Sequence, residues 1–298
     1  MTHKPFADQV AIVTGAGSGM GREHALLLAR LGATVVINDI DPARAEVVRE
    51  IEGFGGRALA DGHDIADHAA AGALVRAAMD IDGRIDMVVS NAGISRNTPF
   101  AELTPDMLAP VMNVNFYGAY HVLQHSWRHL QARNYGRIVI VGSATAWYAQ
   151  ALAAHYAASK GALLGLAKTL AMEGRAHGIT VNLLSPGAYT GMAEKNAPPD
   201  PAVLERMRRT MPAALVAPAV AWLLRPENRL NGQIIEAASG RVALNFVAST
   251  RGYWKRDLTL ADIEAHEAEI LDAAGHAVPQ DTGEWTRWMM DNIGALED

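Results

Sequence analysis

Short apolar runs alternate with segments of helical periodicity along most of the chain. The runs are rich in valine and isoleucine, which is typical of strands buried on both faces. The segments between them repeat apolar residues every three or four positions, as one face of a helix does. This alternation predicts an α/β fold: a single doubly wound, Rossmann-type parallel sheet with helices on both faces. We expect strands at 9–14, 33–39, 57–61, 85–90, 136–142, 179–185 and 233–237, and helices at 22–31, 42–52, 67–79, 104–133, 151–172 and 218–224.

The pattern changes near residue 240. Residues 188–212, between the last two predicted strands, are rich in proline and predict a mobile lid over a binding crevice. Beyond residue 240, half of the six tryptophans lie in a short tail, and residues 259–274 predict an acidic amphipathic helix. We therefore expect a main domain over residues 1–240 and a C-terminal extension over 241–298, packing on that domain or on a neighbouring subunit.

A glycine-rich turn joins the first predicted strand to the first predicted helix. Glycines let the backbone approach a pyrophosphate, and a helix N-terminus offers free N–H groups and the positive end of its dipole. A flexible surface turn is the alternative, but the strand–turn–helix setting favours a dinucleotide cofactor. The residues expected to contact it are Gly15, Ser18, Gly19, Met20 and Gly21.

An acidic residue ends the second predicted strand. Asp39 lies 18 residues beyond Gly21, where a carboxylate can accept hydrogen bonds from both hydroxyls of an adenosine ribose. The same charge repels a 2′-phosphate, so we expect NAD to be preferred over NADP, with Ile40 beside the adenosine. Asp39 could instead simply end the strand, but its spacing favours the ribose contact.

Further cofactor candidates follow the third and fourth predicted strands. In an open α/β sheet the ligand lies in the crevice at the carboxyl ends of the strands. Position alone therefore selects Asp64 and Ile65 after one strand, and Asn91, Ala92 and Gly93 after the next.

A tyrosine and a lysine four residues apart share one face of the helix predicted at 151–172. A free phenol has a pKa near ~10, so Tyr156 needs roughly 4 kcal/mol of relative stabilisation of its anion to act as a base at neutral pH. Lys160, one turn away, is the simplest source of it. The spacing alone occurs by chance on many helices. Ser143, which follows a predicted strand, would face the same crevice, whereas Asn115 alone is typical of a satisfied buried amide.

Composition excludes several classes of function. A formal charge of −6 disfavours binding to nucleic acid or to an anionic membrane, and no apolar stretch is long enough to span a bilayer. The absence of cysteine excludes disulfides, thiolate nucleophiles and iron–sulfur clusters. The eleven histidines show no ligand spacing, so we expect no metal. The N-terminus lacks a signal core and the C-terminus matches no targeting tripeptide, which predicts a cytoplasmic protein.

Together these motifs resemble the short-chain dehydrogenase/reductase family over roughly residues 7–240. Thr14-Gly15-x-x-x-Gly19-x-Gly21 is similar to the family's cofactor turn, and Ser90-Asn91-Ala92-Gly93 to its Asn-Asn-Ala-Gly motif with the first Asn replaced. Pro186 and Gly187 match its Pro-Gly-x-x-x-Thr motif, although Thr190 follows one residue early. The stretch 185–194 and the long tail resemble bacterial relatives of (3R)-hydroxyacyl-CoA and 17β-hydroxysteroid dehydrogenases. Asn115, Ser143, Tyr156 and Lys160 match the catalytic tetrad in order and spacing.

The resemblance implies an NAD-dependent interconversion of a secondary alcohol and a ketone. It assigns the general acid/base to Tyr156, and to Lys160 both the lowering of its pKa and a contact with the nicotinamide ribose. Ser143 would orient the substrate oxygen, Asn115 would hold a relay water, and Pro186, Gly187 and Thr190 would contact the cofactor. Family members usually form oligomers through two long helices, so we expect a homotetramer or homodimer.

The substrate is predicted only as a class. Bulky or apolar residues near the expected pocket indicate a steroid, a terpenoid or a hydroxyacyl-CoA; alternatively they only pack the lid. A catalytically idle NAD-binding regulator and a dehydratase or epimerase that retains NAD are the other functions considered. The intact tetrad disfavours the first, and the spacing of the glycine turn the second. The substrate-contact candidates are Ile94, Ser143, Trp147, Tyr148, Tyr189 and Met192.

Overall fold

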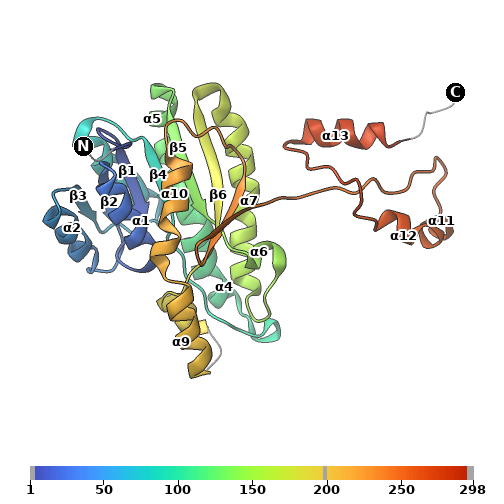
Figure 1. The fold of residues 1–298 in the computed structure, drawn as a ribbon, viewed down its shortest axis with the longest axis horizontal. Helices are drawn as coiled ribbons and strands as arrows, with labels where there is room; N and C mark the ends of the chain where they lie inside the picture. The colour runs from blue at the N-terminus through green and yellow to red at the C-terminus, as the bar shows by residue number, and fades with distance from the viewer. Residues whose placement is uncertain (1–3, 197–199, 294–298) are drawn as a thin grey trace. The chain divides into compact units, whose positions relative to one another are not determined.

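One sheet of eight strands organises the main unit of the protein (Figure 1). The computed structural model describes residues 4–196 and 200–293; residues 1–3, 197–199 and 294–298 of the predicted domain, lid and extension lie outside them. The strand order is β3-β2-β1-β4-β5-β6-β7-β8, and neighbouring strands from β3 to β7 pair in parallel. This confirms the predicted doubly wound sheet. The strands are β1 (Val10–Thr14), β2 (Thr34–Asn38), β3 (Arg57–Asp61), β4 (Met87–Ser90), β5 (Gly136–Val141), β6 (Ile179–Gly187), β7 (Ile234–Ala238) and β8 (Arg241–Asn245), the last without a sequence prediction.

Apolar side chains alternate between the two faces of the sheet and form two cores. Ala11 and Val13 of β1 belong to one core and Ile12 to the other, because successive side chains of a strand point to opposite faces. Each fully buried isoleucine or leucine contributes about 1.5–3 kcal/mol relative to an exposed one. The first core is covered by α1 (Gly19–Arg30), α2 (Arg44–Gly53) and α10 (Ala217–Leu224), and the second by α3 (His68–Asp82), α5 (Gly118–Arg133) and α7 (Ala154–Gly174).

The order of the strands reverses between β1 and its two neighbours. The chain first moves from β1 to β2 and β3 on one side, and then returns to β4 on the other. Such a reversal opens a crevice at the carboxyl ends of the strands, where ligands of doubly wound folds bind. The glycine turn, the residues after β2 and β3, and the residues after β4 all lie at this edge.

The helix predicted at 104–133 is divided. The chain forms α4 (Pro105–Met112), one π-helical segment η2 (Asn113–Tyr117) and then α5. Pro110 lacks an N–H and cannot donate to the preceding turn, which weakens the regular ladder at this point. The π segment places Asn115 toward the interior with 1% of its surface exposed. Short π segments of this kind are frequent at functional sites.

The helix predicted at 151–172 begins later than expected, at Ala154, and a short helix α6 (Thr145–Tyr148) precedes it. Ala149 and Leu152, between the two helices, have φ angles of 61° and 68°, so the chain cannot be helical there. The 3₁₀ segments are η1 (Phe100–Glu102), η3 (Arg175–His177) and η4 (Ala213–Leu215).

The segment predicted to be a lid contains α8 (Gly191–Asn196) and α9 (Pro201–Thr210). Asp200 caps α9 by accepting a hydrogen bond from the N–H of Ala202, as its sequence indicates. The two ends of the segment are joined, because Tyr189 N–H donates to Met211 O at 2.7 Å. The segment thus forms a loop whose two ends are held together by a backbone hydrogen bond. Its mobility stays a prediction.

The C-terminal unit, Asn245–Asp298, contains α11 (Leu260–Ala265), α12 (Glu267–Ile270) and α13 (Thr282–Asp291). The prediction of a single helix at 259–274 is wrong, because two short helices occupy this stretch. The helix is interrupted at His266, whose backbone φ is −115°. The ring of His266 stacks on Tyr253 with the ring centroids 3.8 Å apart, and its Nδ1 lies 2.8 Å from Asp262 O. None of the described residues in 246–293 is buried. What this unit packs on stays a prediction. Among the described residues, no helix combines the length and apolarity needed to cross a membrane.

Candidate active site

The glycine turn between β1 and α1 is held too tightly for any other residue. Gly15 has a φ of +63°, and a Cβ at this position would lie 2.7 Å from Ala92 Cα. A Cβ on Gly21 would lie 2.1 Å from Gly15 O. The sequence thus folds the turn against the end of β4, and the first turn of α1 presents its unbonded N–H groups to the crevice. This arrangement can hold a phosphate.

Asp39 lies directly against the glycine turn. Its Oδ2 accepts a hydrogen bond from Gly17 N–H at 2.9 Å, and its Oδ1 accepts one from Asp41 N–H at 2.9 Å. A Cβ on Gly17 would approach the carboxylate to 2.9 Å, so only glycine permits this contact. The carboxylate is therefore fixed beside the turn while its remaining lone pairs stay available. Turn and carboxylate together fit the pyrophosphate and the ribose of an adenine dinucleotide.

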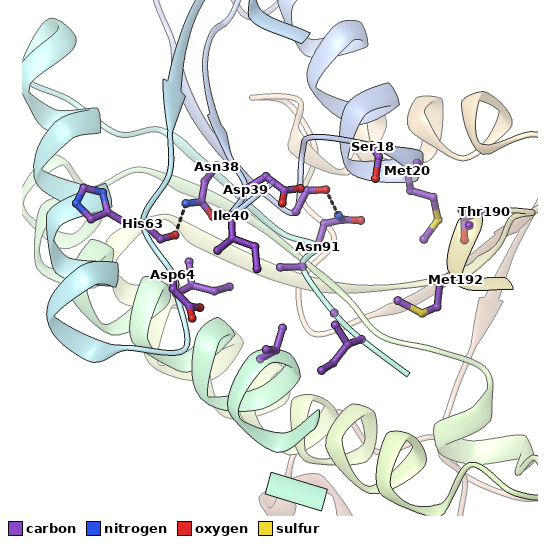
Figure 2. A pocket seen from close by; sticks show the side chains of 18 residues that line it. Ser18, Met20, Asn38, Asp39, Ile40, His63, Asp64, Asn91, Thr190 and Met192 are labelled. Carbon is purple, nitrogen blue, oxygen red and sulfur yellow. Dashed lines mark hydrogen bonds between the residues drawn. The ribbon is translucent and has the colours of Figure 1, made fainter. Parts of the chain in front are cut away.

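A cavity of about 410 Å³ runs along this edge of the sheet (Figure 2). Ile40 and Asp64 lie at one end with Asn38 and His63, and Thr190 and Met192 lie at the opposite end. Most of the predicted cofactor contacts line it: Gly15, Ser18, Gly19, Met20, Asp39, Ile40, Asp64, Ile65, Asn91, Ala92, Gly93 and Thr190.

Some predicted cofactor residues do not line this cavity, namely Gly21, Tyr156, Lys160, Pro186 and Gly187. Gly21 instead packs on Gly15, and Pro186 and Gly187 extend β6, where they pair with Ala237 and Ala238. Thr190, early in its motif, still approaches the glycine turn: its Cγ2 would lie 3.5 Å from a Cβ on Gly19.

The sequence prediction missed four residues that line the cavity. Asn38 and His63 each precede a predicted contact by one position, and Val114 precedes Asn115 in the same way. Gly191 follows Thr190. Their chemistry gave no signal, but their adjacency to the predicted contacts could have found them.

The ends of β1 and β4 are joined by side-chain hydrogen bonds. Thr14 Oγ1 accepts from the N–H groups of Asn91 and Ala92 at 3.0 and 3.1 Å. The amide of Asn91 donates to Thr14 O at 3.0 Å and to Gly15 O at 3.1 Å. These bonds set the distance between the glycine turn and the Asn91–Gly93 segment, and therefore the width of the crevice.

Asn115 holds the segment that follows Gly93. Its Oδ1 accepts from Ile94 N–H at 2.7 Å, and its Nδ2 donates to Ile94 O at 3.0 Å and to Ser159 Oγ at 2.9 Å. A Cβ on Gly93 would lie 3.3 Å from Asn115 Oδ1 and 3.4 Å from Lys160 Nζ. The structure thus brings Asn115 and Lys160 together at the glycine.

Lys160 and Tyr156 form the centre of the predicted tetrad. Lys160 is 3% exposed, its Nζ donates to Val141 O at 2.7 Å, and burial lowers its pKa from 10.5 to about 8. The ammonium lies 5.8 Å from the centroid of the Tyr156 ring.

The phenol of Tyr156 is pulled in two directions. Burial raises its pKa, whereas a hydrogen bond with the Ser143 side chain lowers it. Ser143 is fixed at the end of β5, where its Oγ accepts from Thr145 N–H at 3.2 Å. Lys160, which was predicted to lower the pKa of this phenol, is not among the groups that shift this pKa in the protein without a cofactor. Serine and tyrosine hydroxyls placed in this way can donate to, or accept from, one oxygen atom.

The candidate substrate residues fall into two groups. Ile94 and Met192 line the cavity described above. Trp147 packs against the second core, Tyr148 is 65% exposed, and the Arg208 guanidinium lies 5.6 Å from the centroid of the Tyr189 ring. No group of metal-ligating side chains occurs among the described residues.

Comparisons with known proteins match this geometry. The family model for short chain dehydrogenases matches residues 9–201. A protein of Mycobacterium tuberculosis, named as a short-chain type dehydrogenase/reductase, is 37% identical over 279 residues, which is 90% of this chain and 96% of that protein. The (2S)-[(R)-hydroxy(phenyl)methyl]succinyl-CoA dehydrogenase subunit BbsD of Thauera aromatica is 39% identical over 182 residues, 60% of this chain and 73% of that protein.

A solved structure extends the similarity to nearly the whole chain. The full-length peroxisomal multifunctional enzyme type 2 of Drosophila melanogaster matches 96% of this chain with a TM-score of 0.82 and 27% identity. This chain spans only 49% of that enzyme's length. The chain therefore belongs to the short-chain dehydrogenase/reductase family, whose oxidoreductases use a nicotinamide cofactor.

Proposed function

We propose that this oxidoreductase is NAD-dependent and interconverts a secondary alcohol and a ketone, with Tyr156 as general acid/base. One observation carries the proposal. Ser143, Tyr156, Lys160 and Asn115 converge at the end of the sheet where a glycine turn and a fixed carboxylate fit a dinucleotide. A protein that only bound the dinucleotide would need the turn and the carboxylate but not the hydroxyl pair.

The nicotinamide would supply the redox chemistry by donating or accepting a hydride. The protein's part is to hold the substrate oxygen and to move its proton. The hydroxyls of Ser143 and Tyr156 both donate to this oxygen as charge develops on it during reduction. Tyr156 then gives up its proton to the oxygen, and it takes the proton back during oxidation.

The pKa of Tyr156 sets the direction that neutral pH favours. Because burial raises this pKa, the phenol carries its proton at neutral pH and is ready to act as an acid in ketone reduction. Oxidation requires the phenolate and is expected to accelerate as the pH rises. Lys160, charged at neutral pH because its pKa is about 8, favours that phenolate electrostatically. Asn115 fixes the backbone of Ile94 and would also hold the proposed relay water.

Asp39 supports the preference for NAD. Its carboxylate accepts hydrogen bonds from Gly17 N–H in the glycine turn and from Asp41 N–H just after it in the chain. These bonds anchor the carboxylate beside the turn, where we propose that the adenosine ribose binds. A 2′-phosphate would bring further negative charge against this carboxylate, which at about 4 Å costs on the order of 4 kcal/mol at an effective dielectric constant near 20. NAD is therefore the proposed cofactor.

A bulky, apolar substrate is proposed, and among the candidate classes we favour an acyl-CoA. The apolar contacts offered by Ile94 and Met192 suit a steroid or terpenoid equally well. The support for a thioester is the name of the Thauera aromatica relative, a subunit of a dehydrogenase of a hydroxylated succinyl-CoA. A homo-oligomer and a cytoplasmic location are part of the same proposal.

A substrate panel tests the proposed function. Purified protein is given 3-hydroxyacyl-CoA thioesters, hydroxysteroids and terpenoid alcohols, each with NAD and with NADP, and NADH or NADPH absorbance is followed at alkaline pH. Turnover with NAD and at least one thioester is expected. Turnover only with steroids or terpenoids would overturn the thioester class, a preference for NADP would overturn the argument from Asp39, and no turnover with any alcohol would favour the idle regulator.

A further inference from the structure

A buried carboxylate lies beneath the adenosine end of the cavity. Asp61, the last residue of β3, is 5% exposed. Its Oδ1 accepts from Asn38 Nδ2 at 2.8 Å and from His63 N–H at 3.0 Å, and its Oδ2 hydrogen-bonds to His63 Nδ1 at 2.8 Å. A carboxylate removed from water is unfavourable unless its oxygens are bonded in this way.

The bonds of Asp61 join the end of β2 to His63, which lies beyond the last pair of the β2–β3 ladder. Asn38, itself 2% exposed, also donates to His63 O at 2.9 Å (Figure 2). The backbone ladder between β2 and β3 pairs Asn38 with Asp61, and one further bond links Asp39 N–H to Asp61 O at 3.1 Å. His63 lies past the last pair of the ladder, and the side chains of Asn38 and Asp61 tie it to β2.

Both tied segments continue directly into the adenosine end of the cavity. Asp39 follows Asn38, and Asp64 follows His63, and all four residues line the cavity. Moving His63 away from Asn38 would therefore move Asp64 and Asp39 apart. Because an adenosine must contact both walls at once, a change of about 1 Å in their separation would weaken its binding.

Arg44 also lies against both of these segments. Its Nη1 donates to Ile40 O at 3.3 Å and to Asp41 O at 3.0 Å. Its Nη2 lies where a Cβ on Gly62 would be 2.7 Å away, so the guanidinium covers the β3–α3 segment as well. Arg44 thus packs against both walls, in addition to the hydrogen bonds that Asp61 makes.

We propose that Asp61 is a positioning residue for the adenosine half of the cofactor, which it affects through Asn38, His63 and the two walls they carry. This inference rests on the proposed function, because it needs a dinucleotide in the cavity. Asp61 sets the affinity for the adenosine half and leaves proton transfer at Tyr156 unchanged.

Asp86 provides a matched control. It is a second buried aspartate, 0% exposed, that accepts from Val10 N–H at 2.9 Å and pairs with Arg84 at 2.6 Å. It precedes β4, at the amino ends of the strands, away from the cavity. Losing Asp86 should lower stability without changing cofactor binding, whereas losing Asp61 should change both.

The test measures binding by calorimetry in the full-length chain. We compare wild type with Asp61→Ala, Asp61→Asn and Asp86→Ala, using NADH and ADP-ribose as probes, and record Tm for each variant. Asp61→Ala should raise the Kd of both probes by the same factor, about 10- to 100-fold, since both contain the adenosine. Asp61→Asn should stay within about threefold, because its amide oxygen can still accept from Asn38 and from His63 N–H. At saturating NADH, kcat of Asp61→Ala should stay within about threefold of wild type.

Asn38→Ala cuts the same network from β2 and gives a second measurement should Asp61→Ala fail to fold; it should weaken both probes as well. The inference is overturned if Asp61→Ala, or Asn38→Ala in its place, binds both probes as wild type does. It is equally overturned if Asp86→Ala weakens them as much, because the effect would then be general destabilisation. Loss of NADH affinity with ADP-ribose unaffected would also contradict it. A wild type that binds neither probe would instead overturn the proposed function, and this inference with it.

Discussion

Replacing Lys160 by methionine should change how the stability of the protein depends on pH. Burial lowers the pKa of Lys160 from 10.5 to about 8 in the folded protein. Between these values the unfolded chain binds more protons than the folded one, so the stability of wild type rises with pH. Below about pH 8 both states are protonated, and the folded state carries the full cost of a buried ammonium.

The size of this effect follows from the two pKa values. The difference between 10.5 and about 8 corresponds to about 3.4 kcal/mol. About 2 kcal/mol of it is recovered between about pH 7 and about pH 9.5. Lys160→Met removes the titrating group. Over this pH range the unfolding free energy of wild type should therefore rise by about 2 kcal/mol relative to that of Lys160→Met. With a slope near 3 kcal/mol per M, the urea midpoint of wild type should rise by about 0.7 M relative to that of Lys160→Met over this pH range.

The assay is urea unfolding followed by circular dichroism at several pH values across that range. Lys168→Met, on the same helix, is the matched control. Burial lowers the pKa of Lys168 as well, but its side chain is only half-buried, so its variant should show a smaller pH dependence. Equal pH dependence in wild type and Lys160→Met would refute the idea that Lys160 is held in the fold against its preference for water.

Three further changes test other parts of the site. Asn115→Ala removes three hydrogen bonds to Ile94 and Ser159, so it should lower the unfolding free energy by about 3 kcal/mol and reduce kcat; urea unfolding at wild-type stability would contradict this. Asp39→Ala should lower the ratio of kcat/KM for NADH over NADPH by about tenfold or more, since the charge that repels a 2′-phosphate is gone; an unchanged ratio would remove Asp39 from cofactor selection. Ala149 has a φ of 61° and a ψ of 157°, which only glycine adopts without strain, so Ala149→Gly should raise the unfolding free energy by about 1 kcal/mol; a lower melting temperature would show that no strain is stored there.

The sheet and its helices were predictable because the spacing of apolar residues along the chain depends only on the local sequence. The apolar composition of runs such as Val10–Thr14 by itself indicates buried strands. The three- to four-residue spacing of apolar positions between these runs by itself indicates helices with one buried face. The π segment at Asn113–Tyr117 was not predictable, because its irregularity depends on what Asn115 contacts 21 and 44 residues away. The break at His266 likewise arises from a ring that stacks on Tyr253.

The site was predictable where a chemical type is needed at a fixed spacing. Gly15, Gly21 and Asp39 each have a physical reason to be that residue, and the structure shows the close approaches that require it. Asn38 and His63 were missed because asparagine and histidine at strand ends have many uses. Only the structure shows that a buried carboxylate joins them.

The Tyr156→Phe variant tests the proposed proton transfer most directly. Removing one oxygen deletes the general acid/base and leaves the ring packing and the dinucleotide cavity in place. We expect kcat to fall by about 10²–10⁴-fold, while the Kd for NADH, measured by calorimetry, stays within about threefold of wild type. Tyr120→Phe, at an exposed position on α5, is the control and should retain full activity. Wild-type turnover in Tyr156→Phe would contradict the assignment of Tyr156 as the group that moves the proton.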